Sequence, residues 1–366
     1  MMMKHAIGQP VPRQEDPVLV QGQGRYTDDI NLPGQAHAVM VRSRYAHGVI
    51  RRIDTTAAAR MPGVLAIYTG QELVDAGYGP IMSVMPLVNR DGSQMKRVGR
   101  PALAIDKARY VGDPIATVVA ETREQARDAA EAVEVDIEPL PAVTDARLAL
   151  EPGAPEIWDH APGNLILDYH FGEAEKVAEA FAKAAHVTRL TLVNNRVVVS
   201  QMEPRSAIAS YDPDEDKWTM HMGTQGVFGM REHLRNILKV PPAKVRVITG
   251  NVGGSFGLKG AAFPEYTPLL HAARALGRPV KWTDDRSESF LSDHHGRGTE
   301  NTVEAAFDGQ GRILALRVTG YATPGSYLSS VAPMSGTRSI MQNLIGVYAT
   351  PLVEASIKVA YTNTSP

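Results

Sequence analysis

Hydrophobic and polar positions alternate along the first part of the chain in a pattern that predicts short strands and helices. Residues 63–69 and 115–120 form continuous apolar runs and are predicted to be buried strands. Thr122 and Gln125 have the spacing of a capping box at the start of a helix. Residues 133–137 alternate like a strand with one solvated face. The pattern indicates an α/β domain.

Less regular segments suggest where the domains begin and end. Residues 79–103 are rich in Gly, Pro and Met and lack periodicity, so we expect a long surface loop there. The predicted divisions are an extended arm over 1–16, an α/β domain over 17–141, a proline-containing linker over 142–163 and a second domain over 164–366.

The second half of the chain also mixes helical and strand patterns. The spacing of apolar residues predicts three helices, over 173–185, over 226–239, and around Leu269 with an end at Gly277. Pro268 predicts that the third helix is kinked or begins at that residue. Four further elements are expected: strands at 190–192, 245–248 and 353–361, and a hairpin turn at 308–311.

Composition narrows the functional classes. The chain has 366 residues, of which 43% are hydrophobic and 21% charged, as in a soluble globular protein. A net charge of −2 without basic clusters argues against nucleic-acid or membrane-surface binding. With no cysteine, the chain holds no disulfide, thiolate nucleophile or iron–sulfur cluster. No apolar run reaches ~18 residues and no signal peptide is evident, so we expect a cytoplasmic location without a membrane span.

The stretch NVGGSFGLKG, residues 251–260, is the main candidate for chemistry, and it allows several interpretations. A phosphate-binding loop needs Lys followed by Ser or Thr after its last glycine, but Gly257 precedes Leu258 and Lys259. A serine nucleophile elbow fits the G-x-S-x-G pattern around Ser255. A third interpretation is a glycine-rich backbone surface that approaches a ligand, and a fourth is a simple turn with Phe256 in the core.

The serine interpretation lacks partners in suitable places. Asp284, Asp285, His294 and His295 are the available acids and histidines, but they lie close together in the sequence. Adjacent histidines do not share one face, so a metal pair at 294–295 is not expected. The group of Asp284, Asp285 and Glu288 is expected to be a solvated or salt-bridged strand end.

The loop resembles the Gly-Gly-X-Phe-Gly loop of the molybdenum-binding large chain of the xanthine dehydrogenase and aldehyde oxidase family, which includes aerobic carbon monoxide dehydrogenase. The resemblance extends over essentially the whole chain, through the order and spacing of its motifs. These similar segments are residues 24–30, 42–47, 110–116, 138–143, 202–205, 224–226 and 245–247.

The resemblance implies an α+β fold: an N-terminal α/β hammerhead domain over 17–141, then the first part of a molybdopterin-binding α+β domain over 164–366. It implies that Gln225, Gly253, Gly254, Phe256 and Gly257 bind a molybdenum-molybdopterin cofactor in its cytosine dinucleotide form. Gln225 would hydrogen-bond an oxo ligand of the metal, and the backbone at Phe256 would line the site. Neither residue would ligate the metal directly.

The family's large chain is longer than this one, and its general-base glutamate follows the region matched here. The resemblance therefore implies no catalytic residue in this chain, and the isolated chain is expected to be inactive. The C-terminal half of the large subunit, an iron–sulfur subunit and an FAD subunit would be its partners. Purine-hydroxylating members carry a glutamate at the position of Gly260, so purine recognition of that kind is not implied.

The predicted function is the N-terminal part of a molybdenum hydroxylase large subunit that oxidises an aldehyde, an N-heterocycle or a similar small molecule with water as the oxygen source. The alternatives are a serine hydrolase that uses Ser255 and a non-catalytic assembly module.

Overall fold

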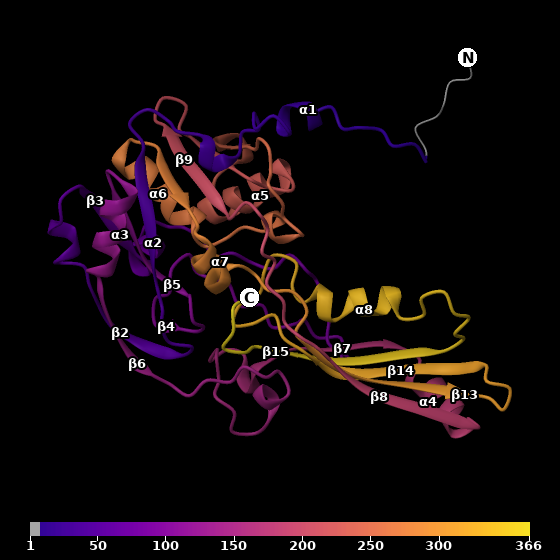
Figure 1. Cartoon of the computed structure of the whole chain (residues 1–366). Coiled ribbons are helices and arrows are strands. Elements are labelled where there is room, and N and C mark those ends of the chain that lie inside the picture. The colour runs from indigo at the N-terminus through magenta and orange to yellow at the C-terminus, as the bar shows by residue number, and fades with distance from the viewer. Residues whose placement is uncertain (1–7) are drawn as a thin grey trace, which may run out of the picture.

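The computed structural model describes residues 8–366 and contains three β-sheets with eight α-helices around them (Figure 1). The strands are β1 Ala36–Arg42, β2 Gly48–Asp54, β3 Val64–Thr69, β4 Lys107–Ala108, β5 Pro114–Ala120, β6 Glu134–Pro139, β7 Leu165–Gly172, β8 His186–Asn194, β9 Ser206–Asp212, β10 Lys217–Met222, β11 Val245–Ile248, β12 Val280–Thr283, β13 Thr299–Phe307, β14 Ile313–Ala322 and β15 Val353–Ala360. The helices are α1 Asp16–Leu19, α2 Gly70–Asp75, α3 Arg123–Glu131, α4 Ala174–Ala182, α5 Val227–Leu238, α6 Tyr266–Leu276, α7 Arg286–Ser292 and α8 Arg338–Asn343.

The largest sheet joins distant parts of the chain. Its seven strands run in the order β11-β10-β9-β12-β1-β5-β3. One half of the sheet comes from early strands, β1, β3 and β5, and the other half from later strands, β9 to β12. The two halves join where β1 pairs in parallel with β12. The sheet therefore crosses from the predicted first domain into the second without interruption. A three-stranded sheet, β4-β2-β6, lies beside its early strands.

The third sheet has five strands in the order β7-β15-β14-β13-β8 and extends away from the other two (Figure 1). Helix α4 covers part of one face through Val177, which packs against Ala306 and Ala315. The opposite face contributes to a core that includes Ile166, Ile357 and residues of the segment 143–161.

Several predicted elements are confirmed. Thr122 accepts a hydrogen bond from the Gln125 backbone N–H at 3.2 Å and so caps α3. Helix α5 buries Met230, Leu234, Ile237 and Leu238, as its periodicity predicts. The turn at 308–311 joins β13 to β14.

Two expectations need correction. The segment 79–103 is irregular, as predicted, and much of it is exposed, but Ile81, Met95 and Val98 are buried in the cores, so it is only partly a surface loop. Helix α6 begins at Tyr266, so Pro268 lies in its first turn, where a missing N–H costs nothing, and no kink results. The predicted linker over 142–163 includes Ile157, which is fully buried.

Candidate functional site

The glycine loop connects β11 to a short 3₁₀ helix at Leu258–Gly260, and its backbone explains its glycines. Gly254 and Gly257 have φ angles of +102° and +99°, a region that side chains with a Cβ rarely adopt. Phe256 has a φ of 50° and is 82% exposed, so it is not a core residue. The interpretation of a simple turn with Phe256 in the core is therefore wrong.

A buried ion pair fixes the base of the loop. The Lys259 ammonium is 1% exposed and lies 2.6 Å from the Glu203 carboxylate. The same carboxylate accepts the Gly253 N–H at 2.8 Å, while the Glu203 N–H donates to the Gly253 carbonyl at 2.9 Å. A Cβ on Gly253 would come within 2.5 Å of the Glu203 Cβ. Glycine at 253 is therefore required by the close approach of the segment 201–203.

Gln225 lies directly beside the loop, at the N-terminal end of α5. Its side-chain Oε1 accepts the Ser255 hydroxyl proton at 2.7 Å, and its backbone N–H donates to the Lys259 carbonyl at 3.3 Å. Ser255 Oγ also accepts the Lys259 N–H at 2.9 Å. The structure thus brings Gln225 together with the residues predicted from the glycine motif.

The exposed part of the loop offers unsatisfied donors. Within residues 8–366, no acceptor binds the backbone N–H groups of Gly254, Ser255, Phe256 and Gly257. Successive free N–H groups with left-handed residues among them form a concave donor surface that suits anionic oxygens. With the Gln225 amide, which directs its oxygen to Ser255 and leaves its NH₂ group free, these donors fit a ligand rich in oxygen atoms.

Ser255 lacks the contacts of a nucleophile. Its hydroxyl touches an amide oxygen and a backbone N–H rather than a histidine or carboxylate base. His294 is half-buried and stacks on Phe263, with ring centroids 4.1 Å apart, and its Nε2 is 3.1 Å from Arg100. The serine hydrolase arrangement is therefore not formed.

The other charged candidates belong to a buried network. Arg205 is 1% exposed, lies 2.6 Å from Asp293 and 2.9 Å from Glu265, and Asp284 is 3.6 Å away. Burial raises the pKa of Asp284, and the Arg205 guanidinium opposes that rise. Asp284 is thus buried beside a cation rather than solvated.

Two neighbours of Asp284 take other roles. Asp285 caps α7 by accepting the Glu288 N–H at 2.8 Å, and the Glu288 side chain pairs with Arg42. Burial lowers the pKa of His295 to about 4. No cluster of His, Cys, Asp or Glu suited to a metal occurs within residues 8–366.

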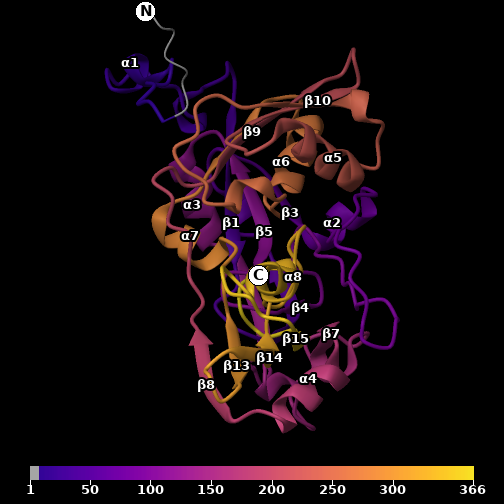
Figure 2. The same cartoon turned by 90° about the vertical axis from the view of Figure 1, so that its right-hand side faces the viewer.

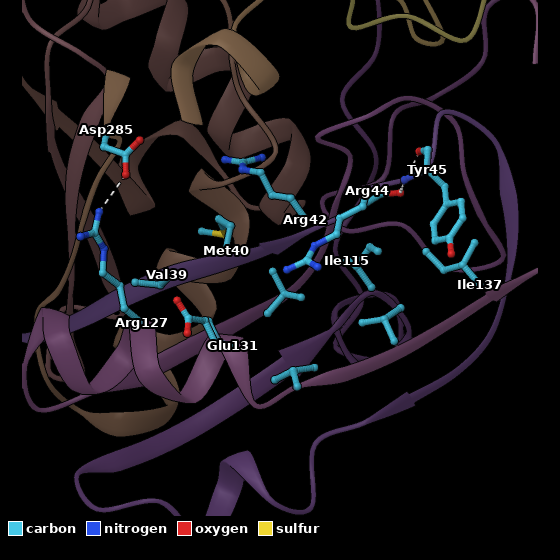
Figure 3. Close-up of a pocket in the computed structure, with 15 residues that line it drawn as sticks. Val39, Met40, Arg42, Arg44, Tyr45, Ile115, Arg127, Glu131, Ile137 and Asp285 are labelled. Carbon is cyan, nitrogen blue, oxygen red and sulfur yellow. Dashed lines mark hydrogen bonds and ion pairs between the residues drawn. The ribbon is translucent and has the colours of Figure 1, made fainter. Parts of the chain in front are cut away.

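A separate cavity of about 670 Å³ lies in the early part of the chain, between β1, α3 and β6 (Figure 3). Arg44 extends into it, and on one side Arg127 pairs with Asp285 at 2.8 Å. None of its lining residues belongs to the glycine loop, and Gln225 is not among them. This cavity is therefore separate from the glycine loop.

Sequence reasoning missed the pair of Glu203 and Lys259. In the sequence, Glu203 is part of the segment 202–205 that resembles the family, and Lys259 is a lysine displaced from the phosphate-binding position. The two residues are 56 positions apart, and no periodicity links them. The one signal was a lysine flanked by glycine and apolar residues, an environment that requires a counter-ion when buried.

Models of two known protein domains match most of the chain. Residues 157–366 match the model of the molybdopterin cofactor-binding domain, and residues 21–141 match the aldehyde oxidase and xanthine dehydrogenase a/b hammerhead domain. The chain belongs to the xanthine dehydrogenase and carbon monoxide dehydrogenase large-subunit family. This confirms the predicted family and the α+β fold with a hammerhead domain.

Individual relatives are similar over nearly the whole chain. The 6-hydroxypseudooxynicotine dehydrogenase complex subunit gamma of Paenarthrobacter nicotinovorans is 35% identical over 98% of this chain and 44% of its own length. The carbon monoxide dehydrogenase large chain of Hydrogenophaga pseudoflava is 31% identical over 96% of this chain and 44% of its own. This family member thus spans less than half the length of these relatives.

Solved structures agree with the fold. Quinoline 2-oxidoreductase from Pseudomonas putida 86 superposes with a TM-score of 0.91 at 33% identity, over 99% of this chain and 45% of that one. Carbon monoxide dehydrogenase from Oligotropha carboxidovorans gives 0.87 at 31% identity, over 98% and 45%. No helix in residues 8–366 is long and apolar enough to cross a membrane.

Proposed function

We propose that this chain is the N-terminal part of a molybdenum hydroxylase large subunit and that Gln225 and the loop 253–257 face its cofactor. The observation that carries this proposal is the hydrogen bond between Ser255 Oγ and Gln225 Oε1 at 2.7 Å. It joins the two motifs on which the family resemblance depends, although they are 30 residues apart. The match of residues 157–366 to a molybdopterin cofactor-binding model supports it.

Each part of the site has a defined task in this proposal. The free N–H groups of residues 254–257 hold anionic or oxo oxygens of the cofactor, and the NH₂ group of Gln225 donates one neutral hydrogen bond. Glu203 and Lys259 hold the loop in place from behind. When bound, the molybdenum centre supplies the redox chemistry that oxidises a small substrate with water as the oxygen source.

The substrate class follows from relatives and from Gly260. Relatives are named for nicotine, quinoline and carbon monoxide, so we propose an aldehyde, an N-heterocycle or a similar small molecule. A Cβ on Gly260 would lie 3.4 Å from Gln225 Oε1, so a side chain at this position would reach the same site. With glycine there, no carboxylate is available at that point to recognise a purine.

The remaining parts of the enzyme are supplied by other polypeptide segments or subunits. Two electrons leave the substrate in each turnover, and a chain without cysteine cannot carry them through iron–sulfur clusters. We propose an iron–sulfur subunit, an FAD subunit and the C-terminal portion of the large subunit as partners, a cytosine dinucleotide form of the cofactor, and a cytoplasmic location.

The test is cofactor content in the assembled complex. Gln225→Ala should lower molybdenum and pterin per chain, or turnover at full loading, by about 2- to 10-fold, because one hydrogen bond of roughly 0.5–1.5 kcal/mol is lost. Gln310→Ala, in the exposed β13–β14 turn, is the matched control. Equal cofactor content and equal turnover in both variants would contradict the proposal. A molybdenum-free assembled complex would favour the assembly-module alternative.

A further inference from the structure

Strand β8 lies at one edge of the five-stranded sheet, and every one of its nine residues is exposed. It pairs with β13 on one side only, and no other described element lies beyond its outer edge (Figure 2). Its apolar side chains are solvated: Val187 is 42% exposed, Leu190 57%, Leu192 48% and Val193 68%.

Apart from the charged side chain of Arg189, the strand lacks the features that normally protect a sheet edge. Edge strands are usually short, bulged, or interrupted by Lys or Pro, because an unprotected row of N–H and C=O groups recruits another strand. The sequence HVTRLTLVN contains no Lys, Pro or Gly. Its register with β13 runs through nine consecutive pairs without a bulge. As an outer strand, β8 would favour aggregation.

Both faces of β8 carry apolar side chains. Val187 and Val193 point to the face on which α4 packs, since Val187 lies opposite Ala306. Leu190 and Leu192 point to the other face, where Leu190 lies opposite Val303, itself packed against the core. A strand with one solvated face alternates apolar and polar residues, whereas apolar residues on both faces are typical of an interior strand.

We propose that β8 is an interior strand of the assembled protein, and that a strand from the part of the large subunit beyond the matched region pairs with its outer edge. This rests on the proposed function. More than half of each relative's length lies outside the match, so polypeptide for such a strand exists in the relatives. The last described strand, β15, already lies in the same sheet. With Arg189 and His186 as its only ionisable residues, β8 fits a largely apolar, uncharged strand.

Hydrogen exchange tests this directly. Deuterium uptake over residues 186–194 is compared between this chain alone and the assembled large subunit purified with its partner chains. We expect uptake at β8 to fall to the level of β13 in the assembly, because its outward amides become bonded. Unchanged uptake at β8 in an assembly that contains molybdenum would overturn this inference and leave the proposed function intact. Protection of β8 in an assembly without molybdenum would support the pairing of β8 and contradict the proposed function.

Substitution provides a second test. Leu192→Lys should lower the yield of assembled complex by about tenfold or more, because a charge would be buried without a partner. It should leave the melting temperature of the chain alone unchanged, since Leu192 is half-exposed there. Val74→Lys, on the exposed side of α2, is the control and should assemble normally. Normal assembly of Leu192→Lys would contradict pairing with a strand of the large subunit. Protection of β8 that rises with the concentration of the chain alone would show instead that a second copy of the chain pairs with it.

Discussion

At the scale of single residues, the orientation of one amide matters most. Ser255 Oγ accepts the Lys259 N–H and donates a hydrogen bond to Gln225 Oε1, so the NH₂ group of Gln225, which has no partner within residues 8–366, remains able to donate to a ligand. To orient the Gln225 amide, Ser255 needs only its hydroxyl and no histidine or carboxylate base beside it. Its hydroxyl contacts only the Gln225 oxygen and the Lys259 N–H.

Substitution of Ser255 tests its role. Ser255→Ala should lower the turnover of the assembled complex by about 2- to 10-fold through loss of one hydrogen bond, while the melting temperature stays near that of the wild type. Ser255→Thr retains the hydroxyl and should recover most of the activity. Stoichiometric labelling of Ser255 by a fluorophosphonate would contradict this role and restore the hydrolase hypothesis.

A second residue predicts a pH dependence. Asp113 accepts hydrogen bonds from the Tyr327 hydroxyl and the Arg109 N–H on one oxygen, and burial raises its pKa from the ordinary 3.8 to about 6. The folded chain therefore binds this proton more tightly than the unfolded chain does. The unfolding free energy should fall by about 3 kcal/mol in total as pH rises from well below 4 to well above 6.

Asp113→Asn isolates this contribution, because its single amide oxygen can accept both hydrogen bonds without titrating. Other groups such as His295, with a pKa of about 4, titrate in both proteins and cancel in the difference. Denaturant titrations between pH 4 and 7 should give a difference that grows across this window. A difference that does not change with pH would show that Asp113 has an ordinary pKa.

At the scale of elements, the glycine loop depends on its backbone. Gly254 has a φ of +102°, and a Cβ there would lie 3.4 Å from the Gln201 Cβ. Gly254→Val should cost about 1–3 kcal/mol of unfolding free energy through backbone strain and should reduce cofactor content. Gly309→Ala, in a turn where a Cβ meets nothing within 4 Å, should change neither. Full cofactor content in Gly254→Val would show that the backbone at residue 254 does not contribute to cofactor binding.

Local elements were predictable where one short-range rule decides them. The capping box at Thr122 and the apolar face of α5 are such cases. Pairing between distant segments was not predictable, because β1 and β12 are more than 200 residues apart and nothing in either strand specifies the other. The resemblance to the family indicated the motifs of the site, but not that Ser255 and Lys259 hold Gln225.

At the scale of the whole molecule, a buried charge network holds the two halves of the large sheet together. Arg42 of β1 pairs with Glu265, at the start of α6, at 2.8 Å, and Glu265 also pairs with Arg205. Arg205→Met would leave Asp284 and Asp293 without the cation that they face and should lower the unfolding free energy by about 3–5 kcal/mol. Arg44→Met, at an exposed guanidinium with no ion pair within residues 8–366, should change it little. Similar stability of the two variants would mean that the network does not hold the fold.

The whole-molecule account depends on where the metal binds. The most direct measurement is anomalous X-ray scattering at the molybdenum absorption edge from crystals of the assembled complex. The account predicts one anomalous peak beside the Gln225 side chain and the backbone of residues 254–257. A peak in the cavity near Arg44, or at any place that the loop does not reach, would contradict it.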